Sequence, residues 1–121
     1  MKKRILVVED TEDNRQILRD LLTAAGYDII EAMDGATGVT MAVDQHPDLI
    51  LMDIQLPVID GYEATRRIKA DPTTRHIPIV AVTSYALAGD ETKTREAGCD
   101  GYIAKPFSPR NLLEKVREFL A

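Results

Sequence analysis

The sequence lacks several features that would point to whole classes of protein. Its single cysteine, Cys99, cannot form an internal disulfide, so a reducing, cytoplasmic compartment fits best. No stretch reaches the roughly 18 apolar residues of a membrane span. The basic residues 2–4 are followed by only four apolar residues before Glu9, too few for a secretory signal peptide. We therefore expect a cytoplasmic protein with no membrane contact.

Positive charge is also scarce. The chain has 15 lysines and arginines against 20 acidic residues, for a net charge of −5. Its basic residues are interleaved with apolar ones, as at Arg66, Arg67 and Lys69, whereas nucleic-acid-binding proteins usually present a dense basic stripe. We predict no nucleic-acid partner.

The composition is that of one ordinary globular domain over 1–121. With 121 residues, 45% hydrophobic and 29% charged, the chain can bury one core but not two. Short apolar runs predict strands over 4–9, 28–32, 48–53, 78–83 and 100–104. The segments between them predict helices over 11–25, 35–45, 61–70, 87–97 and 108–120. This alternation predicts an α/β fold whose parallel sheet is covered by helices on both faces, which explains why the strands are apolar throughout.

Three helices carry informative local patterns. The first has an apolar face that comprises Ile17, Leu18, Leu21, Leu22 and Ala25. Gly26 is expected just after its end, and Ser108 before Pro109 is a favourable start for the last helix. The helix over 87–97 offers only Leu87, Ala88 and Ala97 as apolar contacts. It is therefore either a weakly anchored helix suited to moving or simply a short, exposed one.

Reactive side chains stand at the carboxyl ends of four of the five expected strands: Glu9 and Asp10, Asp53, Thr83 and Ser84, and Lys105. In a parallel α/β sheet these ends share one edge, where ligands bind. We therefore expect three acids, a hydroxyl and an ammonium group to converge there. Asp53, at the end of a rigid buried strand, is the expected reactive group.

Four motifs carry a resemblance to a known family. In order along almost the whole chain, "LVVED", "DLILMDIQLPVIDGYEA", "PIVAVTS" and "GYIAKPF" closely resemble the bacterial response-regulator receiver domain. The resemblance implies a flavodoxin-like, doubly wound fold with five helices and strand order 2-1-3-4-5. The segment "GDETKTREAGCDGYIAKP" is also similar to the single-domain receivers that control cell-division polarity in alpha-proteobacteria.

The resemblance implies a role for each strand-end residue. Asp53 would accept a phosphoryl group from a phosphohistidine, and a carboxylate is a competent nucleophile for this. Asp10 and Asp53 would ligate Mg²⁺ directly, Glu9 mainly through water, and Gln55 through its backbone carbonyl. Three carboxylates bring −3, Mg²⁺ +2 and Lys105 +1, so the loaded site would be near neutral and could receive a phosphoryl group.

The resemblance also implies a conformational switch. Thr83 would bind the new phosphoryl oxygen and pull its loop inward, while Tyr102 would turn from exposed to buried, which would change the face around 87–120. Lys105 would stabilise the phosphoryl group, and the Lys105–Pro106 bond would be cis. Tyr85 is expected to shield the phosphoryl group from water.

The implied partners are proteins. A histidine kinase or a histidine phosphotransfer protein would donate the phosphoryl group, and the expected partner-facing residues are Asn14, Ile17, Leu56, Pro57, Pro106 and Phe107. With no DNA-binding segment after the last helix, the chain is expected to act on downstream protein targets. We expect a monomer or weak dimer, and a phosphoryl acceptor rather than a turnover enzyme.

Other interpretations stay open at this point. Taken singly, Asp10 could cap the first helix, Thr83 could be an ordinary strand residue, and Lys105 could be a surface charge. A haloacid-dehalogenase-type phosphatase also uses an aspartyl nucleophile, but it needs a second acid where this chain has Gln55. A flavodoxin-like FMN carrier needs a phosphate-binding loop where this chain has the acidic "EDTEDN". The chain could also be a receiver from a longer protein.

Overall fold

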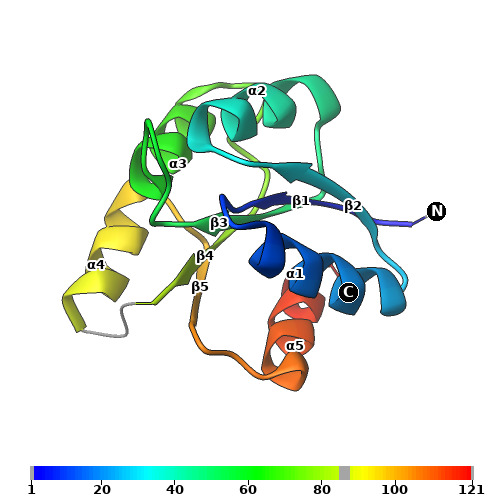
Figure 1. Ribbon diagram of the computed structural model, residues 1–121. Coiled ribbons are helices and arrows are strands. Elements are labelled where there is room, and N and C mark those ends of the chain that lie inside the picture. Colours follow the sequence, from blue (N-terminus) through cyan, green and yellow to red (C-terminus); the bar gives the residue numbers. More distant parts are fainter. Residues whose placement is uncertain (1, 85–87, 121) are drawn as a thin grey trace.

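A five-stranded parallel sheet forms the centre of the molecule, as predicted (Figure 1). The computed structural model describes residues 2–84 and 88–120; Tyr85 and Leu87, on which two of the expectations above depend, lie outside them. The strands are β1 (Arg4–Val8), β2 (Asp28–Ala32), β3 (Leu49–Asp53), β4 (Ile79–Thr83) and β5 (Gly101–Ala104). They are ordered β2-β1-β3-β4-β5, and every neighbouring pair is parallel.

Helices cover both faces of this sheet. They are α1 (Glu12–Ala24), α2 (Gly35–Gln45), α3 (Gly61–Ala70), α4 (Ala88–Ala97) and α5 (Pro109–Leu120). In Figure 1, α1 and α5 lie on one face, α2 and α3 lie on the other, and α4 stands beside α3. Each predicted element is present, with ends that differ from the expected ones by one residue where they differ at all.

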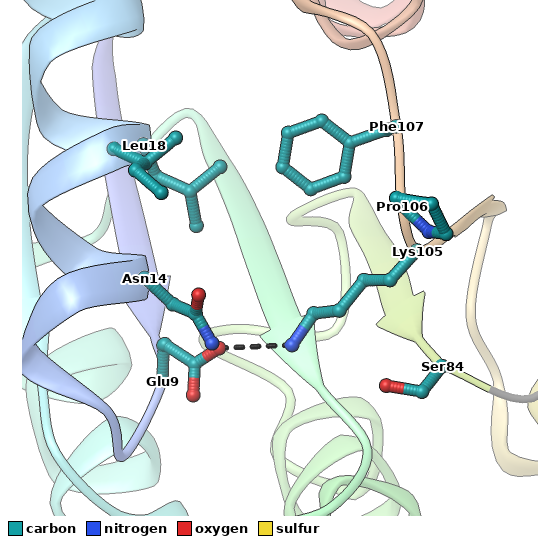
Figure 2. A pocket seen from close by; sticks show the side chains of 8 residues that line it. Glu9, Asn14, Leu18, Ser84, Lys105, Pro106 and Phe107 are labelled. Carbon is teal, nitrogen blue, oxygen red and sulfur yellow. Dashed lines mark hydrogen bonds and ion pairs between the residues drawn. The ribbon is translucent and has the colours of Figure 1, made fainter.

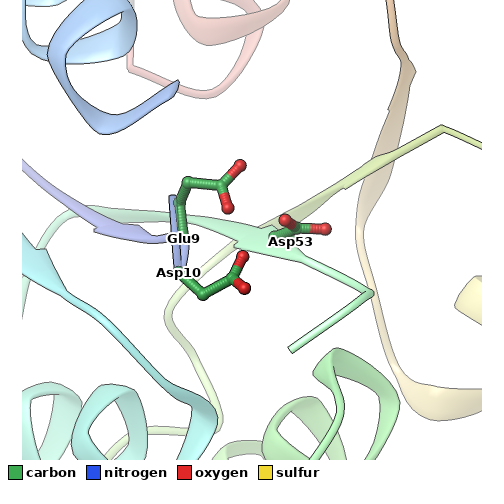
Figure 3. A group of neighbouring side chains, drawn as sticks. All are labelled: Glu9, Asp10 and Asp53. Carbon is green, nitrogen blue, oxygen red and sulfur yellow. The ribbon is translucent and has the colours of Figure 1, made fainter. Parts of the chain in front are cut away.

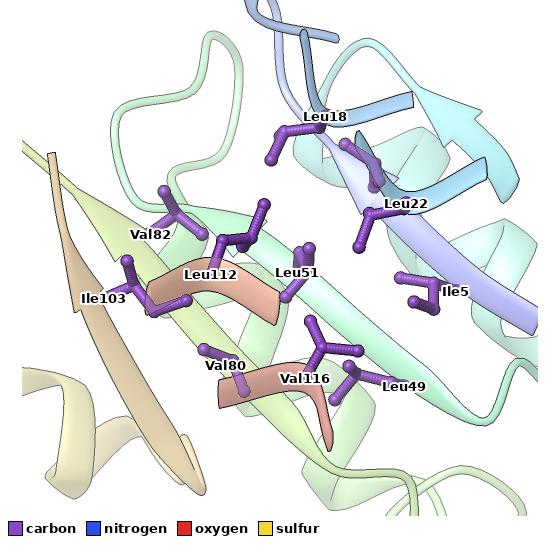
Figure 4. Close-up of a cluster of buried hydrophobic side chains, with 11 residues drawn as sticks. Ile5, Leu18, Leu22, Leu49, Leu51, Val80, Val82, Ile103, Leu112 and Val116 are labelled. Carbon is purple, nitrogen blue, oxygen red and sulfur yellow. The ribbon is translucent and has the colours of Figure 1, made fainter. Parts of the chain in front are cut away.

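The strands are buried on both sides because their side chains alternate between two cores. One core joins α1 and α5 to the sheet and includes Leu22, Leu51 and Leu112 (Figure 4). The other core lies under α2 and α3 and includes Ile50 and Ile68. Asp53 continues the series that Leu51 belongs to, so its side chain is on the α1 and α5 side at the end of a wholly buried strand.

Local capping signals account for the helix ends. The Ser108 Oγ accepts a hydrogen bond from the Asn111 N–H at 3.0 Å, which confirms the predicted start of α5. Gly26 follows α1 with a φ of 97°, also as predicted. The N-cap of α1 is Thr11, so Asp10 is not the cap of this helix. The Lys105–Pro106 peptide bond is cis, as expected.

Two side chains have a burial that the apolar pattern alone did not specify. Ile17 shares the apolar face of α1 and is also an expected partner-facing residue; its side chain is 52% exposed, because the buried stripe of this helix follows Leu18 and Leu22. In the described part of α4, Thr94 is buried together with Ala97, although sequence patterning had assigned it no contact. A threonine can pack as an apolar residue once its hydroxyl is satisfied, so apolar counting alone misses it.

Val58 has a strained backbone. Its φ is 72°, which β-branched residues rarely adopt, and its side chain is 89% exposed, so no packing offsets the strain. We expect Val58→Asn to raise the free energy of unfolding by about 1 kcal/mol, because Asn tolerates the left-handed region. Urea titration measures this. Val58→Ile keeps the branched side chain and should match the wild type, so equal stabilities for all three proteins would contradict the explanation.

Candidate functional site

Three carboxylates meet where strands β1 and β3 end (Figure 3). Glu9 and Asp53 are almost completely buried, at 2% and 5% exposed, whereas Asp10 is open to solvent. Each of the three offers one oxygen atom, and these atoms all lie within 4.8 Å of one another. The predicted convergence of Glu9, Asp10 and Asp53 is therefore present.

Lys105 brings the balancing positive charge into this cluster. Its Nζ donates to Glu9 Oε1 at 2.9 Å and to Asp53 Oδ2 at 3.3 Å. Burial acts to lower the pKa of the Lys105 ammonium, but the hydrogen bond to Glu9 and the charges of Asp53 and Glu9 raise it on balance. The second oxygen of Asp53, Oδ1, accepts a hydrogen bond from the Gln55 N–H at 3.0 Å. Both oxygens of Asp53 are thus held in place.

The cluster has an excess of negative charge. The adjacent Glu9 carboxyl group raises the pKa of the Asp10 carboxyl, and partial burial and the charge of Glu9 raise it further. Three carboxylates and one ammonium leave a formal charge of −2, which a divalent cation would balance. Magnesium prefers hard oxygen ligands and keeps several waters, and the exposed Asp10 leaves room for them. These residues therefore fit Mg²⁺.

The loop over 54–60, between β3 and α3, returns the chain to the end of β3, where Asp53 stands. The Gly61 N–H donates to the Ile54 carbonyl at 2.9 Å, and the Ile54 N–H donates to the Val82 carbonyl at 3.2 Å. A Cβ atom at Gly61 would lie 2.2 Å from the Asp53 carbonyl oxygen, so only glycine fits. Sequence reasoning missed this glycine, for which the preceding helix cap Asp60 was the available signal.

The two predicted switch residues occupy different places. Thr83 is completely buried at the end of β4, and its carbonyl accepts a 2.7 Å hydrogen bond from the Lys105 N–H, which places it beside the lysine. Tyr102 is half-buried on β5, where it borders a polar hollow together with Arg95 and Lys115. The structure therefore places Thr83 next to Lys105, whereas Tyr102 lies farther along its strand.

The predicted partner-facing residues line two separate hollows. One of them, of about 470 Å³, has a mostly apolar wall and opens directly above the Glu9–Lys105 pair (Figure 2). It is lined by Asn14, Ile17, Leu18, Pro106 and Phe107 in addition to Glu9, Ser84 and Lys105. Leu56 and Pro57 line the other hollow, together with Asp10 and Lys93.

The comparisons with known proteins identify the class. The response regulator receiver domain matches residues 5–117, and the chain belongs to this family, whose members work in two-component signalling. It is 45% identical to the polar-differentiation response regulator DivK of Brucella ovis over 120 residues, which cover 99% of this chain and 98% of that protein. The DivK of Brucella anthropi is 44% identical over the same shares.

Solved structures agree with this assignment. The receiver domain of sensor histidine kinase PA1611 from Pseudomonas aeruginosa PAO1, which has a magnesium ion coordinated in its active-site cleft, is 39% identical, with a TM-score of 0.93 over 99% of this chain and 98% of that one. The chemotaxis protein CheY4 of Vibrio cholerae is 26% identical, also with a TM-score of 0.93, over 98% of this chain and 99% of that one. In the part of this chain that is described, no helix is long and apolar enough to cross a membrane.

Proposed function

We propose that this receiver takes a phosphoryl group onto Asp53 from a phosphohistidine on a histidine kinase or phosphotransfer protein. The observation that carries the proposal is the position of Asp53, buried at a strand end within hydrogen-bond reach of Lys105 and close to two further acids. In the reaction a carboxylate oxygen of Asp53 forms a bond to phosphorus, the phosphorus–nitrogen bond to the imidazole breaks, and the released histidine takes up a proton. The chain acts once per phosphoryl group and is not a turnover enzyme.

Each side chain of the cluster has a defined task in this proposal. Asp10, Asp53 and the Gln55 backbone carbonyl would hold Mg²⁺, and Glu9 would act on it mainly through water. When bound, Mg²⁺ neutralises charge on the carboxylates and on the phosphoryl oxygens. Lys105 lies 3.3 Å from Asp53 Oδ2 and can follow the negative charge as it moves to the phosphoryl oxygens.

The switch and its partners extend the proposal. The Thr83 hydroxyl binds a phosphoryl oxygen and draws its loop inward, and Tyr102 turns inward in response, which alters the surface of α4, β5 and α5 for downstream proteins. The kinase docks over the hollow between α1 and Phe107, because its apolar walls surround the route to Lys105 and Asp53. The similarity to the DivK response regulators supports a role in signalling through protein partners. In this proposal the chain acts in the cytoplasm as a receiver domain over 1–121, and as a monomer or weak dimer.

Phosphorylation by a small phosphodonor tests the proposal. The protein is incubated with acetyl phosphate and Mg²⁺, and its intact mass is measured; we expect one added phosphoryl group. Reduction of the acyl phosphate with borohydride followed by peptide mapping should locate it at Asp53, and EDTA should prevent uptake. An adduct on another side chain, none in the presence of Mg²⁺, or multiple-turnover hydrolysis of phosphomonoesters would contradict the proposal.

A further inference from the structure

Arg15 is buried beside the acid cluster, although the proposed chemistry does not use it. Arg15 is only 6% exposed to solvent. Its Nη1 donates a hydrogen bond of 2.9 Å to the backbone carbonyl of Glu9. Burying a guanidinium group is costly unless its N–H donors are satisfied, so the remaining donors of Arg15 also need acceptors.

Two glutamates supply those partners. Arg15 Nη2 pairs with Glu12 in the first turn of α1, and its Nε lies 3.5 Å from Glu31 Oε1 on the edge strand β2. Arg19 pairs with the same two glutamates, at 3.3 Å and 2.9 Å. Two arginines and two glutamates have no net formal charge, so this network adds little to the electrostatic balance of the acid cluster. Its effect is on position.

The position that it holds is the turn from β1 to α1. The Glu9 N–H donates to the Ala32 carbonyl at 3.0 Å, and the Glu9 carbonyl accepts from Arg15. The backbone of Glu9 is therefore fixed on both sides, by β2 through its N–H and by α1 through its carbonyl. Asp10 follows directly and shares this constraint.

We propose that Arg15 is a positioning residue that sets the Mg²⁺ affinity of the receiver. It holds the Glu9 carbonyl and thereby fixes the turn that presents the Glu9 and Asp10 carboxylates. Magnesium demands nearly ideal octahedral geometry. If the turn from β1 to α1 were less rigidly held, the carboxylates of Glu9 and Asp10 would bind it less tightly. This inference rests on the proposed function, because it assigns Arg15 to the same metal site.

A matched pair of arginine variants tests the role. Arg15→Met removes the contact with Glu9 together with ion pairs to Glu12 and Glu31, whereas Arg19→Met removes ion pairs to the same two glutamates only. Isothermal titration calorimetry with magnesium chloride should show magnesium binding about 10-fold weaker in Arg15→Met. A loss of this size is usual when a group that orients the metal ligands is removed. Arg19→Met should stay within about twofold of the wild type.

Phosphoryl uptake from acetyl phosphate adds a second measurement. In Arg15→Met the magnesium concentration for half-maximal uptake should rise by about the same factor of 10, while the rate at saturating magnesium stays within about threefold of the wild type. A loss of rate that saturating magnesium does not restore would overturn the inference.

Wild-type affinity in Arg15→Met, or equal weakening in Arg19→Met, would also overturn it. Urea titration establishes that each variant is folded. If Arg15→Met does not fold, Arg15→Lys decides the matter, because it keeps the charge but not the forked donor, and we expect magnesium binding about 3-fold weaker or more. If the wild type is phosphorylated on Asp53 but the two arginine variants bind magnesium equally well, only the proposed role of Arg15 is lost. Failure of the wild type to bind magnesium would remove both proposals.

Discussion

Asp53→Asn is expected to abolish phosphoryl uptake while leaving the fold intact. An amide cannot serve as the nucleophile, yet it has the shape of the carboxylate, and its oxygen can still accept the 3.0 Å hydrogen bond from the Gln55 N–H. The intact mass after incubation with acetyl phosphate and Mg²⁺ should show no adduct. Uptake at the wild-type level would disprove the assignment of Asp53.

The same variant should be more stable than the wild type when magnesium is absent. The substitution leaves two carboxylates in the acid cluster in place of three, so lost repulsion outweighs the lost pairing of Asp53 with Lys105. We expect a gain of about 1 kcal/mol in the free energy of unfolding, measured by urea titration in EDTA. High salt should reduce this gain.

Asp60→Asn is the matched control for Asp53→Asn. Asp60 lies at the end of the loop that follows Asp53 and caps α3 through a 2.9 Å hydrogen bond from the Glu63 N–H to its Oδ1. Asparagine caps helices equally well, so both the stability and the phosphoryl uptake of this variant should match the wild type. If both variants lose phosphoryl uptake, the cause is damage to the loop and not the loss of the Asp53 carboxylate.

Gly61→Ala is expected to cause the largest loss of stability, at least about 3 kcal/mol. The new Cβ would lie 2.2 Å from the Asp53 carbonyl oxygen and 2.7 Å from the Ile54 Cα. Both are backbone atoms of the buried strand end, so neither can move aside as a flexible side chain would. Because the overlap falls on Asp53 itself, phosphoryl uptake should fall as well. Urea titration and the mass measurement check the two effects.

Gly26→Ala separates steric overlap from backbone strain. Gly26 has a φ of 97°, but a Cβ there would meet no atom within 4 Å. Its replacement should cost only the left-handed penalty of about 1–2 kcal/mol, without any effect on phosphoryl uptake. Equal losses of stability for the two glycine variants would contradict the overlap explanation for Gly61.

Sequence patterning located the elements of this protein because the signals are local. The alternation of apolar runs with helical spacing predicted every strand and helix, and the Ser108 and Gly26 boundaries follow from residues next to them in the chain. The strand-end acids were predictable for the same reason, since parallel strands share one carboxyl edge. The strand order came from the family resemblance and was confirmed by the structure.

The errors and omissions depend on contacts between distant residues. The exposure of Ile17 could not be derived from helical spacing, which shows which face a residue is on, but not how wide the buried stripe is. Arg15 looked like an ordinary helix residue, and only the packing of α1 against β2 reveals its pairing with Glu31. The need for glycine at position 61 arises from the return of α3 over the end of β3.

The sequence by itself determined where this chain forms strands and helices, and which side chains stand at the strand ends. Local backbone preference and the burial of apolar faces act over a few residues, so they can be read from neighbouring positions. Only the tertiary structure decided that Lys105 lies 2.9 Å from Glu9, which is 96 positions away, and that Arg15 is buried. Such contacts depend on how whole helices and strands pack against one another, which no local pattern specifies.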